Sequence, residues 1–487
     1  MDTFKPQDIA YLAPLFLFAI SGLLLVLAEA FTSGRQRAFM MKMTVAACAV
    51  TAIVCVLLWK KLAGPIKPFG GMLVVDKLGL FGCVLFAGTC AFTAITTAGH
   101  QREHGWENGE FYGLMLLAAS GMAMLAMAGD LVTVFLGIES MSLAAYVLIA
   151  LRRKGEAGSE GAMKYFLMGA FATGFLLYGI ALCAAKSTNI ETITTHIANN
   201  PSDPLIIVGV LFMVIAFGFK VAAVPFHMWA PDAYQGAPTP VTGFMASAVK
   251  AAAFIGMLRV FGTAFGGDSL PLGQMGWTTA FAILAAITMT VGNIAALRQE
   301  NVKRMLAYSS ISHAGLLLIG VVAAGMAPAG TGQSAVLYYL VAYSVTTLGA
   351  FAIATWIGSR ERERVLVADY AGLATKHPGM ALGMTICLLS LGGMPPTGGF
   401  FAKFYVLKAG MEVADQTLLW LVVIGAINSV VSIFYYLRVV MAMYFREPVG
   451  EFKVIRSGGI AFVVAACATL VLQMGLMPGW WLKVAGL

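Results

Sequence analysis

Residues 379–408 read GMALGMTICLLSLGGMPPTGGFFAKFYVLK. A helix of roughly 20 apolar residues spans a bilayer, and this segment is long and apolar enough to do so. However, Gly392–Phe400 places two prolines and four glycines at its centre. Proline removes a backbone donor and clashes with the preceding turn, so one continuous helix is not expected. Within a membrane, such a break is tolerated only where it is buried in protein or faces water.

The composition of the whole chain also indicates a membrane protein. Its 487 residues are 60% hydrophobic and only 11% charged, and the mean hydropathy is +0.85. Soluble domains average about 25% charged residues, so a water-soluble enzyme and a disordered chain are both excluded. The net charge of +8 does not indicate nucleic-acid binding, because the basic residues lie in short clusters between apolar runs. We predict an all-α polytopic protein that contacts the lipid bilayer.

The apolar segments predict about fourteen membrane helices. The expected spans cover residues 9–30, 39–59, 74–97, 111–128, 131–151, 161–185, 204–224, 238–265, 276–297, 303–324, 333–357, 379–408, 417–445 and 456–478. The first span precedes Ala28-Glu29-Ala30, which resembles a signal-peptide cleavage site. Its apolar stretch is longer than the roughly 7–15 residues of a signal peptide, so we expect the helix to be retained.

Basic residues in the loops predict the orientation of the chain. Loops after odd-numbered spans hold about twice as many Lys and Arg residues as the other loops, and Arg298, Lys303 and Arg304 belong to one of them. Cytoplasmic loops carry such an excess, so both termini are expected on the non-cytoplasmic side. Arg259 and Arg438 lie near span ends and are expected to be snorkelling anchors.

A second helix break and weak internal similarities predict a repeat. Pro225 interrupts the seventh span, five spans before the break in the twelfth, and residues 139–142 and 162–166 resemble residues 309–312 and 335–339. Two five-helix units would have inverted orientations, and inverted repeats with broken helices are typical of transporters. The expected units are an N-terminal three-helix segment (1–110), a first repeat (111–265), a second inverted repeat (276–445) and a C-terminal helix (446–487).

Several charged residues fall inside the expected spans, where each costs at least about 2.5–3.5 kcal/mol to insert. Glu139 and Lys250 lie in the middle of their spans, too far from an interface to snorkel. Lys220 ends the first half of the seventh span, where exposed carbonyls favour a cation. Lys403 follows the break in the twelfth span, where the dipole of the second half-helix opposes a cation. Lys164 lies near a span end, so snorkelling and function remain open.

Three further polar residues are weaker candidates. His313 could relay protons, because histidine titrates near neutral pH, but a packing role is equally compatible with its position. His227 and Asp232 bracket Trp229-Ala230-Pro231 and are expected at the cytoplasmic mouth, with either a functional or a loop-structuring role. The seven cysteines and six histidines show no metal-ligand or disulfide spacing, so the sequence predicts no metal site.

Glu and Lys residues at successive spans, with polar breaks between them, indicate a hydrated path for ions across the bilayer. Protons fit best, because a lysine ammonium cannot coordinate Na⁺. The chain shows no nucleotide-binding motif and no pattern for haem or iron–sulfur ligation. Because moving a charge against 100 mV costs about 2.3 kcal/mol, the energy has to come from a partner protein or from ion exchange.

Four motifs resemble a known family. Residues Lys220–Pro238 are similar to the signature of the antiporter-like subunits of respiratory complex I, which are related to multisubunit cation/proton antiporters. Residues Pro395–Tyr405 resemble subunit N of proton-pumping NADH:quinone oxidoreductase in particular, and Glu160–Phe166 and Asn301–His313 also match. The resemblance extends over essentially the whole chain.

This resemblance implies a proton channel in which Glu139 pairs with Lys220, Lys250 is central and Lys403 lies at the twelfth span. It implies a translocase subunit of the bacterial inner membrane, driven by quinone reduction in other subunits. Flavin, iron–sulfur clusters, NADH and quinone are then expected in partner subunits, with no cofactor in this chain. The implied partners are the other membrane-arm subunits, including sister antiporter-like subunits.

Two alternatives remain open at this point. The chain could be a subunit of a stand-alone Na⁺/H⁺ antiporter, whose transport would respond to Na⁺ without NADH. It could also be a membrane scaffold, in which the buried charges only fix helix packing.

Overall fold

The computed structural model describes most of the chain, in the ranges 6–31, 37–105, 108–151, 156–184, 187–199, 203–265, 276–327, 330–358, 363–413, 417–448 and 454–486. Within these ranges the protein is helical, and β-structure is limited to isolated bridges. This agrees with the all-α class predicted from the sequence.

The α-helices follow one another with short connections. In chain order they are α1 (Pro6–Tyr11), α2 (Ala13–Ala30), α3 (Arg37–Lys61), α4 (Lys77–His104), α5 (Glu110–Ala126), α6 (Leu131–Ala150), α7 (Glu156–Cys183), α8 (Ile190–Asn199), α9 (Pro204–Lys220), α10 (Trp229–Gly236), α11 (Thr239–Phe244), α12 (Lys250–Arg259), α13 (Trp277–Leu297), α14 (Val302–Met326), α15 (Gly332–Trp356), α16 (Leu373–Lys376), α17 (Pro378–Gly392), α18 (Gly398–Met411), α19 (Leu419–Phe445), α20 (Gly458–Leu476) and α21 (Pro478–Ala485). Single helical turns of other kinds occur at Phe69–Gly71, Met245–Val249, Val260–Ala264 and Val367–Tyr370.

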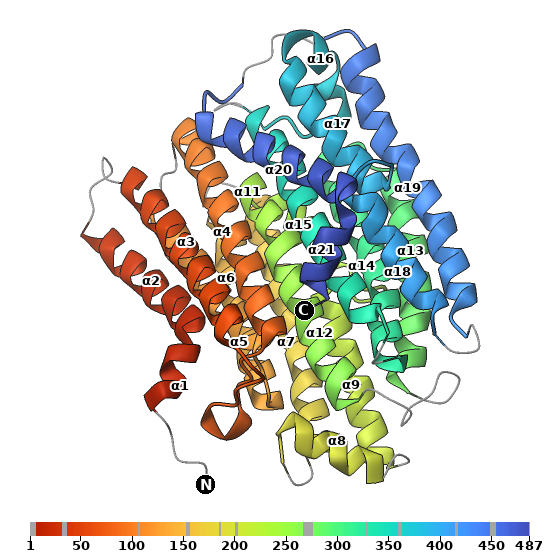
Figure 1. Ribbon diagram of the computed structural model, residues 1–487. Helices are drawn as coiled ribbons and strands as arrows, with labels where there is room; N and C mark the ends of the chain where they lie inside the picture. The colour runs from red at the N-terminus through yellow and green to blue at the C-terminus, as the bar shows by residue number, and fades with distance from the viewer. Residues whose placement is uncertain are drawn as a thin grey trace.

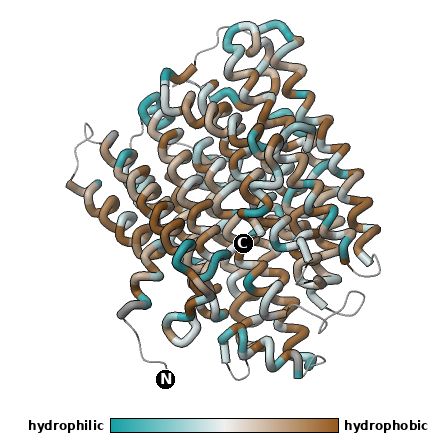
Figure 2. The backbone as a smooth tube through the Cα atoms, in the orientation of Figure 1, coloured by the Kyte–Doolittle hydropathy of each residue, from teal (hydrophilic) through white to brown (hydrophobic). Residues whose placement is uncertain are grey.

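Eleven helices in the described ranges are long and apolar enough to cross a membrane. Three shorter apolar helices, α5, α9 and α17, occupy other segments where the sequence predicts spans. Figure 2 shows hydrophobic residues along most of the helices, with hydrophilic segments gathered mainly at the two ends of the molecule. The protein is therefore a multi-pass membrane protein of helical type.

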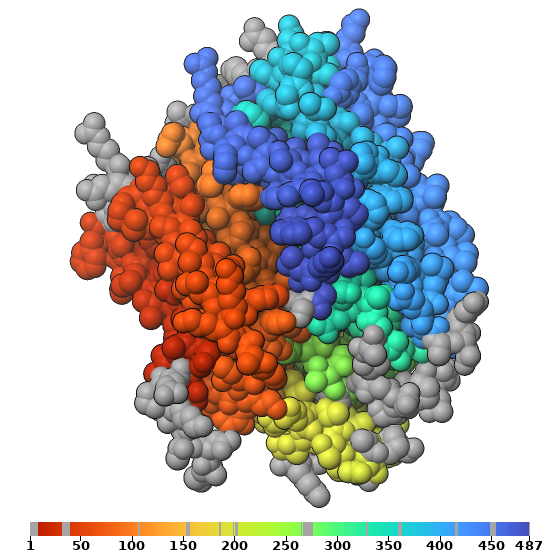
Figure 3. Space-filling view, viewed as in Figure 1, coloured from red at the N-terminus to blue at the C-terminus, as the bar shows by residue number. Residues whose placement is uncertain are grey.

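The helices differ strongly in burial. Of the most apolar windows, all of the Thr239–Thr263 segment, 94% of α14 and 89% of α15 are buried, against 28% of α2. In Figure 1, α14 and α15 lie in the middle of the molecule, whereas α2 and α3 lie at one edge and α19 at the opposite edge. The C-terminal helices α20 and α21 cover one face of this arrangement (Figure 3). Lys250 in the Thr239–Thr263 segment and His313 on α14 are therefore enclosed by other helices.

Both predicted helix breaks are present. α9 ends at Lys220 and α10 begins at Trp229, with Pro225 between them; α17 ends at Gly392 and α18 begins at Gly398. Each break contains a cis X-Pro peptide bond. At the second break the chain returns so closely that a Cβ on Gly399 would lie 1.9 Å from the Ser390 carbonyl oxygen. Only glycine fits at position 399.

The long segment before Lys250 contains a feature that the sequence does not predict. Met245–Val249 forms a π-helical turn that joins α11 to α12, and Lys250 follows it directly. A π-turn adds a residue to one turn of a helix, and such turns are frequent at functional sites. It sets the direction in which α12 presents the Lys250 side chain.

Arg259 and Arg438 were expected as snorkelling anchors, and for Arg259 this expectation is wrong. Arg259 is only 8% exposed; it forms an ion pair with Asp76 and donates a hydrogen bond of 2.9 Å to the Ala126 carbonyl. Arg438 donates to the carbonyls of Leu297 and Gln299 at the end of α13. Carboxylate and carbonyl groups within the protein thus hold the Arg259 guanidinium group. Arg438 is partly exposed and its Nε has no hydrogen-bond partner in the described ranges, so the snorkelling role of Arg438 stays a prediction.

We expect Arg259→Met to destabilise the protein by about 3 kcal/mol, because Asp76 would keep a partly buried charge without its partner. The measurement is thermal unfolding of the detergent-solubilised protein. A double variant, Arg259→Met with Asp76→Asn, should recover part of the loss, because it removes both charges. An unchanged unfolding temperature for Arg259→Met would show that the pair contributes no stability.

Candidate functional site

Lys250 lies at the centre of the helical assembly and is 3% exposed. Its Nζ donates a hydrogen bond of 2.6 Å to the carbonyl oxygen of Ser310, and a second hydrogen bond to the Ser310 hydroxyl. The ammonium also lies 5.9 Å from the centre of the Tyr343 ring, within the range of a cation–π contact. Lys250 of α12 is thereby joined to α14 and α15 by neutral groups only.

His313 lies one turn beyond Ser310 on α14 and is also buried. Its Nδ1 is 2.5 Å from the hydroxyl of Tyr339, and its Nε2 is 3.2 Å from the hydroxyl of Tyr436. Tyr343 stacks obliquely on the imidazole, with ring centres 5.0 Å apart. Because Tyr343 also contacts Lys250, a polar run leads from Lys250 to His313.

Lys403 is 5% exposed on α18 and faces the second helix break. Its Nζ donates to the Gly392 carbonyl at 2.9 Å and to the Ser432 hydroxyl at 3.1 Å. Gly392 is the last residue of α17, so the ammonium lies at a helix C-terminus, where the dipole favours a cation. The opposing dipole of α18, expected from the sequence, is thus countered because the side chain reaches back across the break.

A small cavity lies beside His313. It has a volume of ≈ 10 Å³ and is lined by His313, Tyr343, Thr346, Ser390 and Gly399, among other residues. Such a volume is about that of one water position. Ser432 and Tyr436 lie one turn apart on α19, and they contact Lys403 and His313 respectively. Each of the two titratable side chains therefore contacts a hydroxyl group of the same helix.

Lys220 is the last residue of α9 and is 5% exposed, so it lies at a helix C-terminus as expected. Its Nζ donates a hydrogen bond of 2.7 Å to the Ser142 hydroxyl of α6. Glu139, one turn earlier on α6, is half-buried and accepts a hydrogen bond of 2.6 Å from Thr173. Between these described residues, no ion pair within 4.0 Å joins Glu139 to Lys220. Ser142 and Thr173 occupy the direct contacts instead.

Lys164 and Asp232 belong to a partly exposed ion-pair cluster. Lys164 Nζ lies 2.6 Å from Glu160 and 2.7 Å from Asp232, and Arg304 lies 2.7 Å from the other oxygen of Asp232. Burial alone would raise the pKa of Asp232, but hydrogen bonds from Lys164 and Arg304 outweigh it and hold this pKa below its usual value. The Lys164 side chain is 44% exposed, so it is joined to a surface cluster and not to the buried lysines.

His227 lies in the first break, between α9 and α10, and is half-buried. In the described part of the chain, no hydrogen bond or ion pair connects it to Asp232. The two residues that bracket Trp229 therefore do not form one site.

Lys303, expected in a loop, lies in the first turn of α14 and is 1% exposed. Its Nζ donates a hydrogen bond of 2.6 Å to the Ala237 carbonyl and lies 3.6 Å from a carboxylate oxygen of Glu363. The Asn301 side chain caps α14, so the helix begins at Val302, one residue before Lys303. The adjacent basic residues Lys303 and Arg304 suggested a loop in the sequence. In the structure, a carbonyl and a carboxylate accommodate Lys303 inside the protein.

Comparisons with known proteins agree with this geometry. Residues 128–432 match the family described as NADH:quinone oxidoreductase/Mrp antiporter, TM. NADH-quinone oxidoreductase subunit N 1 of Sorangium cellulosum is 42% identical, with 97% of this chain and 97% of that protein covered. The chain belongs to the subunit N family of NADH-quinone oxidoreductases.

Two solved structures resemble this subunit N family member over nearly its full length. A chain of respiratory complex I from Thermus thermophilus with bound aureothin is 32% identical, with a TM-score of 0.80 over 96% of this chain and 98% of that one. A chain of the Mrp complex from Dietzia sp. DQ12-45-1b has a TM-score of 0.82 over 98% of this chain and 96% of that one. At 19% identity, this second likeness shows the fold alone.

Several polar partners in this subunit N family member could not be found from the sequence. Tyr339 and Ser432 contact His313 and Lys403 from the next helix along the chain, and Tyr436 contacts His313 from α19, 123 residues away. Ser310 and Ser142 lie in the short stretches that suggested an internal repeat. This similarity was the one feature of the sequence that could have indicated a role for the two serines. Each serine receives a hydrogen bond from a buried lysine.

Proposed function

We propose that this chain is a proton-translocating membrane-arm subunit of an NADH:quinone oxidoreductase. The proposed path uses Glu139, Lys220, Lys250 and Lys403, with His313 between the last two. Lys164, His227 and Asp232 are proposed to contribute at most indirectly, because their described contacts do not join this path.

One observation carries the proposal. Lys220, Lys250 and Lys403 are each at least 95% buried, and their hydrogen-bond partners in the described ranges are hydroxyl and carbonyl groups, with no carboxylate within 4.0 Å. A lysine in a buried ion pair cannot lose its proton without leaving an uncompensated anion. These three lysines carry no such constraint, so a proton can leave each of them and return.

The geometry suggests how protons pass between the titratable residues of the proposed path. Serine and tyrosine hydroxyls both donate and accept hydrogen bonds, and such groups lie beside each buried lysine and on both sides of His313. The cavity of ≈ 10 Å³ beside His313 adds room for about one water. Lys220 and Glu139 would exchange a proton through Ser142 and Thr173 or through water, since they form no direct pair.

We further propose a two-part architecture for the transport unit. The two broken helices and the three short apolar helices support about fourteen spans, with inverted repeats at residues 111–265 and 276–445, a segment at 1–110 and a last helix at 446–487. The excess of basic residues in alternate loops supports termini on the non-cytoplasmic side of a bacterial inner membrane.

Energy for transport is proposed to come from partner subunits. The relatives are named as subunits of NADH-quinone oxidoreductase, and flavin, iron–sulfur clusters, NADH and quinone are expected in the other subunits. A subunit of a Na⁺/H⁺ antiporter is the second candidate, supported by the fold shared with the Mrp complex.

The test is to isolate this chain from its native membrane in mild detergent and assay the preparation for NADH:quinone reductase activity. We expect the activity to be recovered with a large set of membrane and peripheral subunits. Proton uptake into proteoliposomes should then depend on NADH and quinone and not on Na⁺. A small assembly without NADH oxidation, showing Na⁺-dependent proton movement, would replace this proposal with the antiporter.

A further inference from the structure

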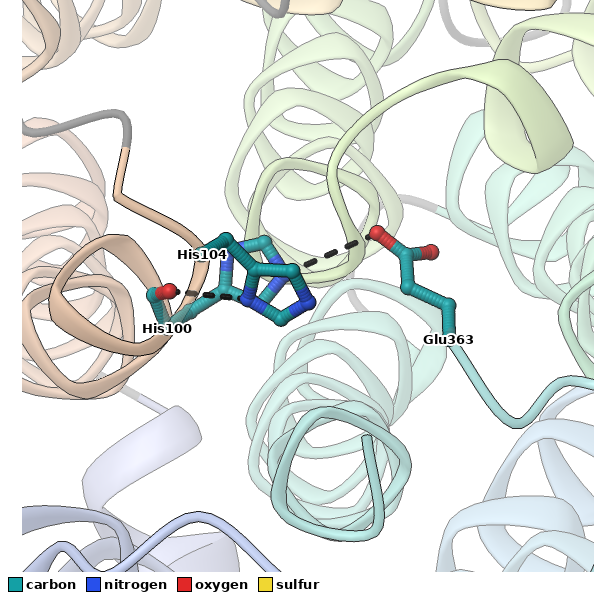
Figure 4. A group of neighbouring side chains, drawn as sticks. All are labelled: His100, His104 and Glu363. Carbon is teal, nitrogen blue, oxygen red and sulfur yellow. Dashed lines mark hydrogen bonds and ion pairs between the residues drawn. The ribbon is translucent and has the colours of Figure 1, made fainter. Parts of the chain in front are cut away.

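A second group of polar side chains lies apart from the lysine path. His100 and His104 occupy the last turn of α4, and Glu363 precedes the helical turn Val367–Tyr370. One ligand atom from each of the three residues lies within 4.8 Å of the others. Figure 4 shows the two imidazoles facing the carboxylate across a narrow gap. No metal site was predicted from the sequence; the four-residue spacing of His100 and His104 was overlooked, and Glu363 lies far from both along the chain.

The spacing and the donor types fit a metal ion. Residues four apart lie on the same face of a helix, so His100 and His104 present their rings together. Two imidazoles and one carboxylate are a donor set that binds Zn²⁺ and leaves one tetrahedral position for water. The proposed function uses none of these three side chains.

His104 is oriented as a metal ligand would be. Its Nδ1 is 2.9 Å from the His100 carbonyl oxygen, which can only accept, so Nδ1 carries the proton. The lone pair is then on Nε2, which is buried and has no hydrogen-bond partner among the described residues. Metal-ligating histidines usually donate the other ring N–H to a carbonyl or carboxylate, which fixes the tautomer and the ring direction.

Glu363 is held in a similar way. One carboxylate oxygen lies 3.6 Å from His100 Nε2. The other lies 3.6 Å from Lys303 Nζ and accepts a hydrogen bond of 3.4 Å from Thr239. The contacts of the second oxygen direct the first toward the histidines. The Lys303 charge lowers the affinity for a cation without blocking the coordinating oxygen.

We propose that His100, His104 and Glu363 bind a divalent transition metal ion, with Zn²⁺ as the ion that best fits the donors. The bound ion would link the end of α4 to the segment that follows α15. This inference does not depend on the proposed function.

The test uses the protein purified with its native partners, treated with a chelator, and then equilibrated with Zn²⁺. Zinc content is compared among the wild type, His104→Gln and Glu363→Gln, with His196→Gln on α8 as the matched histidine control. The wild type and the control should hold about one more zinc ion per complex than either site variant, since a lost ligand lowers affinity by about 100-fold or more. Equal zinc content in all four proteins would overturn the proposal.

A second measurement needs no variant and covers the case in which the substitutions impair assembly. Electron cryo-microscopy maps of the wild-type complex are recorded with saturating Zn²⁺ and with a chelator. A density peak among His100, His104 and Glu363 that is present only with Zn²⁺ would support the site. A map with saturating Zn²⁺ and no such peak would show that the three side chains only pack against one another.

Discussion

Replacing Lys250 with methionine is expected to lower proton translocation per assembled complex by at least about tenfold, which corresponds to about 1.4 kcal/mol in the barrier. Methionine keeps the length and apolar body of the side chain but removes the titratable amine. Proton pumping is measured as quenching of a pH-sensitive dye in proteoliposomes, normalised to the amount of intact complex on a native gel.

Assembly of the Lys250→Met complex should be largely retained. The substitution leaves the Ser310 carbonyl and hydroxyl without their lysine partner, and an unsatisfied buried group costs about 1–3 kcal/mol. A large helical assembly tolerates a loss of this size. Lys376→Met, at an exposed lysine on α16, is the matched control and should pump like the wild type.

Lys250→Arg separates proton transfer from positive charge. Arginine keeps the charge and can donate to Ser310, but it is not deprotonated in proteins. If Lys250 passes protons, the arginine variant should fail to pump as the methionine variant does. If the charge only fixes helix packing, as in the scaffold alternative, arginine should restore activity. Normal pumping by Lys250→Met would remove this residue from the path altogether.

Local chemistry explains which parts of the fold could be predicted from the sequence. The breaks after Lys220 and Gly392 were visible because proline and glycine act on the turn in which they stand. The π-turn at Met245–Val249 was not visible, because it contains no residue that disfavours a helix. Its formation depends on packing against neighbouring helices, and a single sequence does not encode that packing in a local pattern.

The candidate site likewise contains residues that the sequence predicted and residues that it did not. Buried lysines were conspicuous because charge is rare in apolar segments, and Lys220, Lys250 and Lys403 are indeed buried. Their partners were hidden, since serine and tyrosine are unremarkable in a membrane helix. The direct Glu139–Lys220 pair implied by the family resemblance is absent from these described residues, because Ser142 and Thr173 hold the two side chains separately.

Lys403→Met is expected to reduce proton translocation about as strongly as Lys250→Met, for a related reason. The amine bridges the second helix break, from α18 to the Gly392 carbonyl and to Ser432 on α19. Methionine removes both the bridge and the proton acceptor. Lys408→Met is a control on the same helix, because Lys408 is half-exposed and pairs with Glu412 at 3.5 Å. This control should assemble and pump normally.

The double variant Lys250→Met with Lys403→Met decides whether the two lysines act in one path. The effects of two substitutions in one proton path are not additive, because blocking either residue already stops proton transfer. The double variant should therefore pump at about the rate of the weaker single variant. Independent roles would multiply the two losses, as expected for distant sites without shared partners. A multiplicative loss would contradict the proposed path from Lys250 through Tyr343 and His313 to Lys403, even if each single variant were impaired.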